Sequence, residues 1–251
     1  MPPALLTCNV ADGVHQLTHA YVNAYLIEDG SGVTVVDLGL PRMWPRLLMA
    51  LRSLGHGLAD VRGVVLTHAH FDHIGSARRL TELTDIPIWL HAADGYIAQH
   101  PYRYEHERAR LPYPVRSRGG RRVLGAMSLA GALTVRGFEA THPLHTGAEL
   151  DLPGRPVVIP TPGHTAGHVA LHLPDRDALL VGDALVTLDP YTGAEGPRIV
   201  AGAATADSAE NLRCLDALVA TDARIVLPGH GPVWSHGIAE AVGVARRRGA
   251  S

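Results

Sequence analysis

The stretch Val64-Val65-Leu66-Thr67-His68-Ala69-His70-Phe71-Asp72-His73 runs from an apolar segment directly into four metal-binding side chains. The apolar residues predict a buried strand, and the four polar side chains follow where that strand ends. Imidazole and carboxylate groups suit zinc and related divalent cations. Bringing four of them together costs free energy in desolvation and repulsion, which a bound cation offsets. The stretch therefore predicts a metal site that takes further ligands from elsewhere in the chain.

Strand-like and helix-like segments alternate on both sides of this stretch. The first half predicts strands at 21–27 and 33–37, a helix at 41–54, a strand at 64–67, a helix from 73 through 83 and a strand at 86–90. The second half predicts strands at 157–159, 169–173, 178–181 and 224–227, with a helix at 206–221. Such alternation favours helices that cover a sheet, with functional groups collected in loops beyond the strand ends.

Three later loops supply candidate ligands at the ends of predicted strands. His164 lies in Thr-Pro-Gly-His, Asp183 in Leu-Val-Gly-Asp and His230 in Leu-Pro-Gly-His. Glycine precedes each candidate, which suits a tight turn or a close backbone approach. Repeated placement at strand ends is what a single convergent site needs.

The composition describes one globular unit with a nearly neutral surface. The chain has 251 residues, of which 46% are hydrophobic, so we expect a single domain over 1–251. The net charge of -2 and the pI near 6.8 argue against nucleic acid or an anionic membrane as the main partner and favour a small-molecule substrate. All 22 basic residues are Arg, which excludes a Schiff-base or P-loop lysine. Nothing in the composition defines the oligomeric state.

The cysteines and the N-terminal segment indicate the compartment. Cys8 and Cys214 are far apart in the sequence and too few for a disulfide framework, so a reducing environment is expected. The first residues lack the apolar core of a signal peptide, and no window reaches the length of a membrane span. We therefore expect a cytoplasmic protein.

The segment at about 92–150 has a looser pattern that is rich in Pro, Arg and Tyr. One interpretation is a solvated surface insertion. The other is a lid that lines the substrate pocket, since long loops over an active site are often functional. On the second interpretation Tyr102 and Tyr104, together with Tyr191 further along the chain, are candidate substrate-binding residues.

These motifs, in this order, resemble those of the metallo-β-lactamase superfamily from the hairpin near Tyr21 to His230, with a ligand set similar to that of glyoxalase-II-like enzymes and lactonases. The resemblance implies an α/β (α+β) fold, a four-layer αββα sandwich, with a two-metal site on one edge. It assigns the first metal to His68, His70 and His164, the second to Asp72, His73 and His230, and a bridging role to Asp183.

The resemblance also implies two supporting residues. Asp37, at the end of an early strand, is similar to the carboxylate that orients a ligand histidine in this family. The alternative for Asp37 is a strand-end turn before Gly39. His168 receives a supporting role because the resemblance gives metal binding to His164.

The implied cofactor is a pair of divalent metal ions, with zinc as the default and iron or manganese as alternatives. Two such ions about 3.5–4 Å apart share a water and lower its pKa toward about 7. We therefore predict a hydrolase that cleaves an ester, thioester or lactone bond of a small molecule with a metal-bridging hydroxide. Asp72 is predicted to orient the water or move a proton.

Departures from individual subfamilies narrow this function. True β-lactamases of the superfamily lack an aspartate at the position of Asp183, so antibiotic hydrolysis is not expected. Flavodiiron proteins carry glutamate where this chain has His70. Glyoxalase-II-like enzymes have a helical extension that binds glutathione, whereas few residues follow His230 here. Lactonases place a tyrosine shortly after the bridging aspartate, and Tyr191 is the nearest tyrosine in this chain.

Three other functions stay open on the sequence. The first is an oxidoreductase similar to persulfide dioxygenases, which use a single iron held by two histidines and an aspartate. The second is a metal-binding protein without catalysis. The third is a nuclease, for which the basic segment at 116–122 is the only support, and such segments are more often solvated surface.

Overall fold

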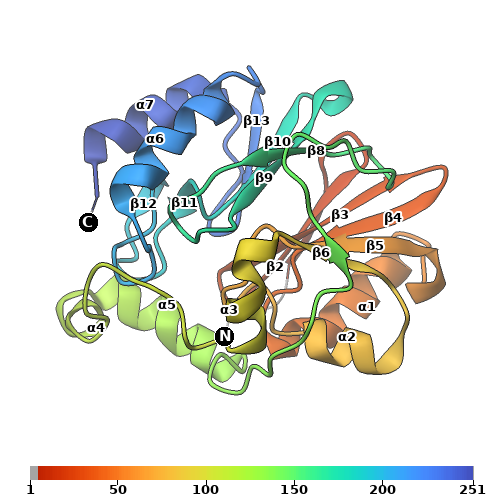
Figure 1. Cartoon of the computed structure of the whole chain (residues 1–251), viewed down its shortest axis with the longest axis horizontal. Coiled ribbons are helices and arrows are strands. Elements are labelled where there is room, and N and C mark those ends of the chain that lie inside the picture. The colour runs from red at the N-terminus through yellow and green to blue at the C-terminus, as the bar shows by residue number, and fades with distance from the viewer. Residues whose placement is uncertain (1–4, 251) are drawn as a thin grey trace.

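The computed structural model describes residues 5–250, whose strands form two main sheets and a small ribbon (Figure 1). The first sheet has the order β1 (Leu5–Ala11), β2 (Val14–His19), β3 (Val22–Asp29), β4 (Gly32–Val36), β5 (Val61–Val65), β6 (Ile88–Leu90) and β7 (His142–Pro143). The second has the order β13 (Ile225–Pro228), β10 (Ala178–Gly182), β9 (Val169–Leu173) and β8 (Val157–Pro160). The ribbon pairs β11 (Val186–Leu188) with β12 (Glu195–Arg198).

Parallel pairing brings the functional strand ends to a common edge. Strands β4, β5 and β6 are parallel neighbours in the first sheet, and β10 and β13 are parallel in the second. The carboxyl ends of parallel neighbours meet at the same edge of a sheet. The loops that follow these strands therefore lie together.

Alternate residues of each strand face different layers of the core. In the first sheet, Leu26, Val35 and Val64 pack with the helices on the outside, whereas Ile27, Val36 and Val65 face the second sheet. In the second sheet, Leu180 and Leu227 face inward, and Leu179 and Val226 pack with the outer helices. This two-residue period is what strands buried on both faces require.

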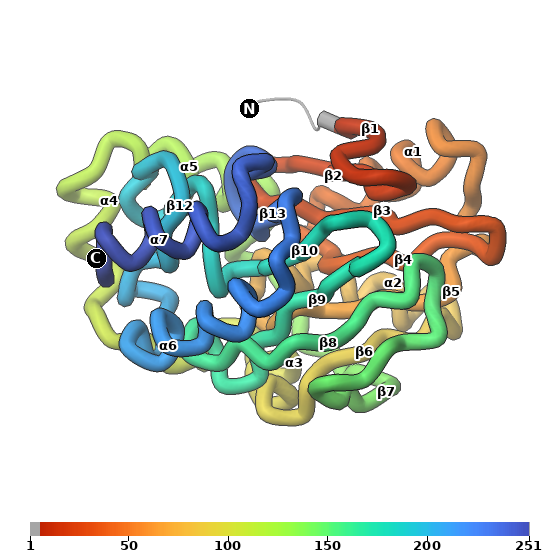
Figure 2. The backbone as a smooth tube through the Cα atoms, turned by 90° about the horizontal axis from the view of Figure 1, so that it is seen from above, coloured from red at the N-terminus to blue at the C-terminus, as the bar shows by residue number. Residues whose placement is uncertain are grey.

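Helices complete the four layers. Helices α1 (Trp44–Ser53) and α2 (Ala77–Leu83) cover the outer face of the first sheet, and α6 (Ser208–Val219) and α7 (Ile238–Arg248) cover that of the second (Figure 1). The order of layers is thus α, β, β, α, as the resemblance implied. Figure 2 shows α4 (Pro112–Arg116) and α5 (Arg118–Leu129) at the same end of the molecule as α7 and β12. Helix α3 (Gly95–Gln99) packs against the first sheet through Ala98.

Some predicted boundaries were wrong. The helix expected from His73 begins only at Ala77, because residues 71–76 form the turns that present the ligand side chains. The first sheet starts earlier than expected, with β1 and β2. The segment at 92–150 contains three α-helices and a 3₁₀ turn rather than only loops. Tyr21, expected in a strand, lies in a turn with a φ of 67°.

Hydrogen bonds join the two sheets beside the site. The Asn23 side chain donates to the carbonyl oxygens of Pro228 and Gly231, both at 2.8 Å, and the Tyr25 hydroxyl donates to Pro228 O at 2.7 Å. These bonds fix the end of β13 against β3. Among the described residues, no helix has the length and apolar character needed to cross a membrane.

Candidate metal centre

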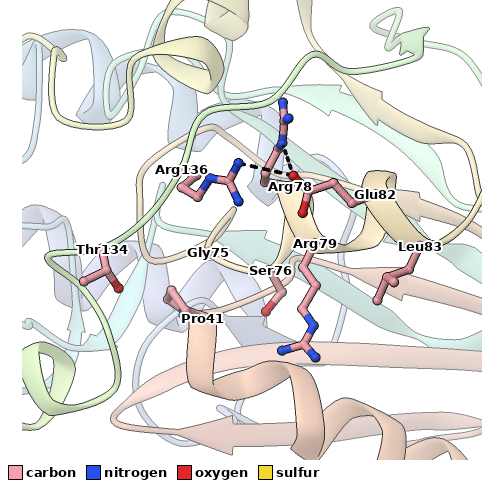
Figure 3. A pocket seen from close by; sticks show the side chains of 9 residues that line it. All are labelled: Pro41, Gly75, Ser76, Arg78, Arg79, Glu82, Leu83, Thr134 and Arg136. Atoms are coloured by element: carbon pink, nitrogen blue, oxygen red, sulfur yellow. Dashed lines mark hydrogen bonds and ion pairs between the residues drawn. The ribbon is translucent and has the colours of Figure 1, made fainter.

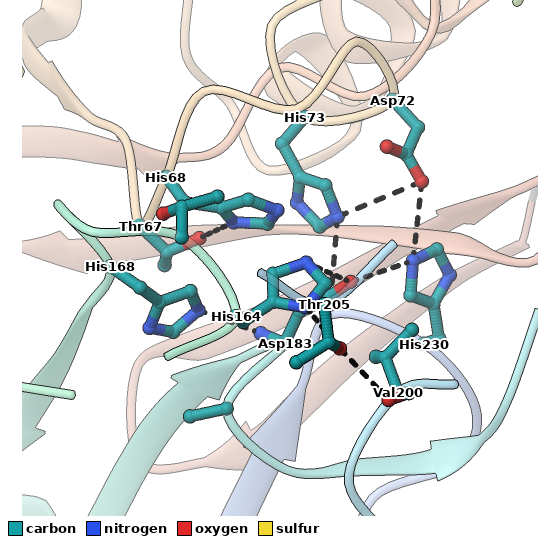
Figure 4. A network of polar contacts seen from close by, with 12 residues as sticks. Thr67, His68, Asp72, His73, His164, His168, Asp183, Val200, Thr205 and His230 are labelled. Carbon is teal, nitrogen blue, oxygen red and sulfur yellow. Dashed lines mark hydrogen bonds and ion pairs between the residues drawn. The ribbon is translucent and has the colours of Figure 1, made fainter. Parts of the chain in front are cut away.

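The seven predicted ligands lie in the loops that follow β5, β8, β10 and β13. Figure 4 labels all of them except His70. All are buried, with exposed fractions from 0% to 6%, and Asp72 has the highest. The structure thus brings together side chains that are up to about 160 residues apart in the sequence.

Three groups of ligand atoms in the structure are close enough to hold a metal ion. They are His68, His70 and His164; His68, His73 and Asp183; and Asp72, His73 and His230, with the atoms of each group within 4.8 Å of one another. Asp183 lies between the groups, because its Oδ2 is 3.5 Å from His164 Nε2 and 3.2 Å from His230 Nε2. Its Oδ1 is 3.6 Å from His73 Nε2. This is the position that a carboxylate shared by two cations would take.

The buried nitrogen atoms of this cluster fit a metal. The Nε2 atoms of five histidines have no hydrogen-bond partner among the described residues, and neither does Asp183 Oδ1; the histidines are His68, His70, His73, His164 and His230. Buried polar atoms are normally paired, and an unpaired one is costly. Since these atoms converge, a cation would satisfy them together.

In four of these rings the other nitrogen, Nδ1, makes a hydrogen bond that leaves Nε2 facing the cluster. His68 Nδ1 lies 3.0 Å from Thr67 Oγ1, whose own proton goes to Asp37 Oδ2 at 2.9 Å. Since the hydroxyl has already used its proton, we infer that His68 Nδ1–H donates to it. His164 Nδ1 lies 3.3 Å from Thr205 Oγ1, which donates to Val200 O at 2.8 Å, and the same inference holds.

The Nδ1 atoms of the other two rings, His73 and His230, donate to stronger acceptors. His73 Nδ1 lies 2.9 Å from Asp37 Oδ2, and His230 Nδ1 lies 2.8 Å from the Tyr21 carbonyl oxygen. Both acceptors take a proton from Nδ1, so Nε2 is the ring nitrogen that faces the cluster. Asp37 also accepts from the Thr67 backbone N–H at 2.9 Å, so it is more than a turn residue.

Each glycine before a ligand has a structural reason. Gly163 and Gly182 have positive φ values of 124° and 48°, which L side chains rarely adopt. At Gly229, a Cβ would lie only 2.1 Å from Asp183 Oδ1. The three loops therefore depend on glycine for their shape or for close approach.

The charges divide the cluster into two electrostatic environments. Burial lowers the pKa of His70 to about 4 and holds the pKa values of His68 and His164 well below the usual range. Burial also lowers the pKa of His73, but Asp183, Asp37 and Asp72 outweigh it and raise this pKa to about 9. The three-histidine group is thus ready to coordinate at neutral pH, whereas a cation near His73 must displace a proton.

His168 lies beside the cluster, and its Nε2 is bonded to the main chain rather than left without a partner. Its Nε2 accepts from the Asp183 backbone N–H at 3.0 Å, and its Nδ1 lies 2.7 Å from Thr161 Oγ1. The ring therefore contacts the main chain that carries Asp183 and offers no free nitrogen to a metal.

The three tyrosines predicted to meet the substrate lie in different places. The Tyr104 ring is 4.1 Å from the His70 ring, and the Arg110 guanidinium lies 4.1 Å from the Tyr104 ring. Tyr191 is buried and hydrogen-bonded to Tyr104. Tyr102 uses its hydroxyl to bind Ala132 O and Val135 N, at 3.0 Å and 2.7 Å, so it holds the chain after α5.

Two cavities differ in their relation to the cluster. A cavity of about 470 Å³ is lined by His164 and Tyr104 together with Arg103 and Glu105, and so adjoins the cluster. A second, of about 320 Å³, lies beside α2 and contains Arg78, Arg79 and Arg136 (Figure 3). Its lining includes none of the seven predicted ligands, so it is a separate feature of the surface.

Sequence reasoning missed several supporting groups. Thr67, Thr205 and the Tyr21 carbonyl hold ligand rings, and Asp94 binds two of the ligand loops. Thr67 directly precedes His68, which was the only available signal. The others come from distant segments, and nothing in their local sequence marks them.

Comparison with known proteins identifies the family of this chain. The family model described as the metallo-beta-lactamase superfamily matches residues 17–230. The match spans most of the chain, so the protein belongs to the metallo-beta-lactamase superfamily.

Individual relatives are distant. The probable metallo-hydrolase YflN of Bacillus subtilis (strain 168) is 26% identical over 234 residues, which cover 88% of this chain and 84% of the relative. The metallo-beta-lactamase family protein TTHA1429 from Thermus thermophilus is 26% identical with a TM-score of 0.68, covering 94% of this chain and 79% of that one. TTHA1623, solved in a di-iron-bound form, is 25% identical with a TM-score of 0.59, covering 99% of this chain and 98% of that one.

Proposed function

We propose that this protein is a binuclear metal-dependent hydrolase that cleaves an ester, thioester or lactone bond of a small molecule, with zinc as the default metal. The observation that carries the proposal is the convergence of five buried Nε2 atoms that have no hydrogen-bond partner among the described residues, around the carboxylates of Asp72 and Asp183. The description of YflN as a probable metallo-hydrolase is consistent with hydrolysis.

The roles of the chain's own residues follow from their positions. His68, His70 and His164 would hold one cation, Asp72, His73 and His230 the other, and Asp183 both. When bound, two such cations lower the pKa of a shared water and polarise a substrate carbonyl. Asp37 keeps the His73 ring in its orientation, and His168 does the same for the main chain at Asp183.

Asp72 is the ligand that we assign a second role. It is the most exposed of the seven, and its Oδ2 lies 3.2 Å from His230 Nε2. Its carboxylate is therefore placed to orient an attacking water and to accept its proton.

We place the substrate in the cavity beside His164. Tyr104 and Arg103 of its lining come from the segment at 92–150, which supports the interpretation of this segment as a pocket wall or lid. Of the three tyrosines, Tyr104 is the better substrate contact, because it lines this cavity. The Tyr102 hydroxyl is already occupied by main-chain groups, and Tyr191 is buried behind Tyr104.

Iron is the alternative metal, since TTHA1623 was solved in a di-iron-bound form. A single-iron oxidoreductase similar to persulfide dioxygenases is less well supported, because Asp72, His73 and His230 form a second group of ligand atoms.

The test is a substrate panel of small esters, thioesters and lactones on protein loaded with zinc, and separately with iron. We expect turnover of at least one class, and a loss of more than about 100-fold in Asp183→Ala, beyond the usual cost of an outer-shell substitution. Asp175→Ala is the control and should retain turnover, because Asp175 is exposed in the turn before β10, at the opposite end of that strand from Asp183. Oxygen consumption with glutathione persulfide by the iron-loaded protein, without hydrolysis, would contradict the proposal.

A further inference from the structure

Asp94, outside the predicted ligand set, accepts hydrogen bonds from two different ligand loops. It is the last residue of a 3₁₀ turn at Ala92–Asp94 and is fully buried, with 0% exposed. Its Oδ2 accepts from the Ala69 backbone N–H at 2.9 Å and from Thr165 Oγ1 at 2.8 Å. Its Oδ1 accepts from the Gly167 backbone N–H at 2.7 Å.

These donors come from the segments that carry three of the candidate ligands. Ala69 stands between His68 and His70, and Thr165 directly follows His164. One carboxylate therefore connects the loop after β5 to the loop between β8 and β9. These loops belong to different sheets, so their spacing depends on contacts of this kind.

The close fit around Asp94 indicates that the connection is specific. A Cβ at Gly167 would lie 2.6 Å from Asp94 Oδ1, so no larger residue fits there without displacement. Asp94 also stands at the N-cap position of α3, yet its side chain makes no hydrogen bond to that helix. Within residues 5–250, no arginine or histidine forms an ion pair with it. All three hydrogen bonds that its carboxylate accepts from described residues thus come from the ligand loops.

We propose that Asp94 is a positioning residue that fixes the two loops relative to each other and thereby sets the spacing of the Nε2 atoms of His68, His70 and His164. The part of the proposal that concerns metal rests on the proposed function. The connection between the loops rests on the chain's own geometry and is tested separately.

Asp94→Asn is the informative substitution. The amide keeps the size of the side chain but has one acceptor oxygen and one NH₂ donor. Whichever way the amide turns, its NH₂ faces a backbone N–H, either of Ala69 or of Gly167, and neither can reverse. One of the two loops therefore loses its bond and meets a repulsive contact.

Asp189 provides a matched control. It is also 0% exposed and accepts from the Tyr191 backbone N–H at 3.0 Å and from Thr192 Oγ1 at 2.8 Å. A further donor is the Ala201 backbone N–H. All three donors lie outside the two ligand loops. Asp189→Asn therefore reproduces the loss of a buried, hydrogen-bonded carboxylate without touching the two ligand loops.

The experiment compares wild type, Asp94→Asn and Asp189→Asn in the full chain. Hydrogen exchange on metal-free protein reports the loops, and Co²⁺ titration against a chelator, with the visible absorption of bound Co²⁺, reports the site. In Asp94→Asn we expect faster exchange in 67–73 and 161–168, a loss of Co²⁺ affinity of about 10–100-fold and an altered spectrum. In Asp189→Asn we expect a lower melting temperature. Exchange in those two segments, the Co²⁺ affinity and the Co²⁺ spectrum should all be the same as in wild type.

Native exchange in both segments of Asp94→Asn would overturn the proposal, and so would the same acceleration in Asp189→Asn. If Asp94→Asn does not fold, Thr165→Val removes one bond at constant shape and should accelerate exchange in 161–168; unchanged exchange there overturns the proposal. Wild type that binds no Co²⁺, with exchange accelerated as expected in Asp94→Asn, would contradict the proposed function while supporting the connection between the loops.

Discussion

Four histidines of the cluster have a hydrogen-bond partner on Nδ1, and these partners differ in chemistry. His68 and His164 donate to hydroxyls, His73 donates to a carboxylate, and His230 donates to a main-chain carbonyl. A carboxylate partner makes an imidazole more basic and a stronger ligand. At the scale of the residue, metal affinity on the His73 side of the cluster should therefore depend most strongly on the residue that holds the ring, which is Asp37.

Asp37→Asn tests that dependence. The amide can no longer accept from the Thr67 backbone, the Thr67 hydroxyl and His73 together, so we expect metal affinity at the His73 side to fall by about 10–100-fold. Chelator competition measures this affinity. Asp222→Asn is the control, because Asp222 also has a positive φ, of 54° against 60° for Asp37, but is exposed. An equal loss in both variants would contradict the role of Asp37.

Gly229→Ala tests the close approach behind the cluster. The new Cβ would lie 2.1 Å from Asp183 Oδ1, so the carboxylate must move. We therefore expect the metal content of the purified variant to fall by at least one ion per chain. Gly30→Ala meets no atom within 4 Å and has no positive φ, so it should bind as wild type does. Full metal content in Gly229→Ala would show that the Asp183 position is not needed.

The residue types of the cluster were readable from the sequence, whereas their support was not. The motif around His68 and the three Gly-preceded loops named all seven side chains that the structure gathers. Asp94 and Thr205 act through tertiary hydrogen bonds, and nothing in their local sequence requires those bonds.

At the scale of elements, helix α5 depends on two glycines where it meets the 189–193 loop. A Cβ at Gly120 would lie 1.9 Å from the Tyr191 carbonyl oxygen, and one at Gly119 would lie 3.0 Å from the Cα of Gly193. Gly125, in the same helix, has nothing within 4 Å of its would-be Cβ. The helix therefore approaches the loop that carries Tyr191 through a face without side chains.

The contrast between Gly120 and Gly125 predicts opposite effects on stability. Gly120→Ala should destabilise the protein by about 1–3 kcal/mol through overpacking. Gly125→Ala should stabilise it by up to about 1 kcal/mol, because alanine is the better helix former. Urea unfolding of both variants measures the difference. Equal stabilities would mean that α5 is not docked on this loop.

Elements were predictable where periodicity was clear. Strands such as Val169–Leu173 were found with their bounds, because apolar runs between turns leave few alternatives. Strand β2 was missed because it buries His15, Gln16 and His19, and partners such as Glu28, 3.0 Å from His15, are invisible in a local pattern. Helices α4 and α5 were missed because prolines and paired glycines obscure their periodicity.

At the scale of the molecule, the site exists only because two sheets meet. The first sheet supplies the loop of His68 to His73, and the second supplies His164, Asp183 and His230. The sequence predicted convergence at strand ends but could not supply distances, since these depend on the bonds that join β3 to the end of β13.

The fold also determines how reactive the two thiols, Cys8 and Cys214, are. Cys8 is exposed, whereas burial raises the pKa of Cys214 to about 12. A raised pKa keeps the folded thiol protonated, so this group's contribution to stability is present below about pH 9 and is lost as the pH rises toward 12. Ellman's reagent at about pH 8, below the ordinary thiol pKa, should therefore modify one thiol quickly in native protein and two after denaturation. Two fast thiols in native protein would contradict the burial of Cys214.

The most direct test of the central claim is the metal content of the 251-residue chain, purified without chelators and measured by elemental mass spectrometry against protein concentration. The arrangement of His68, His70 and His164 on one side of Asp183, and of Asp72, His73 and His230 on the other, predicts two divalent ions per chain, with zinc as the default. A clean value of one or none would contradict the binuclear centre.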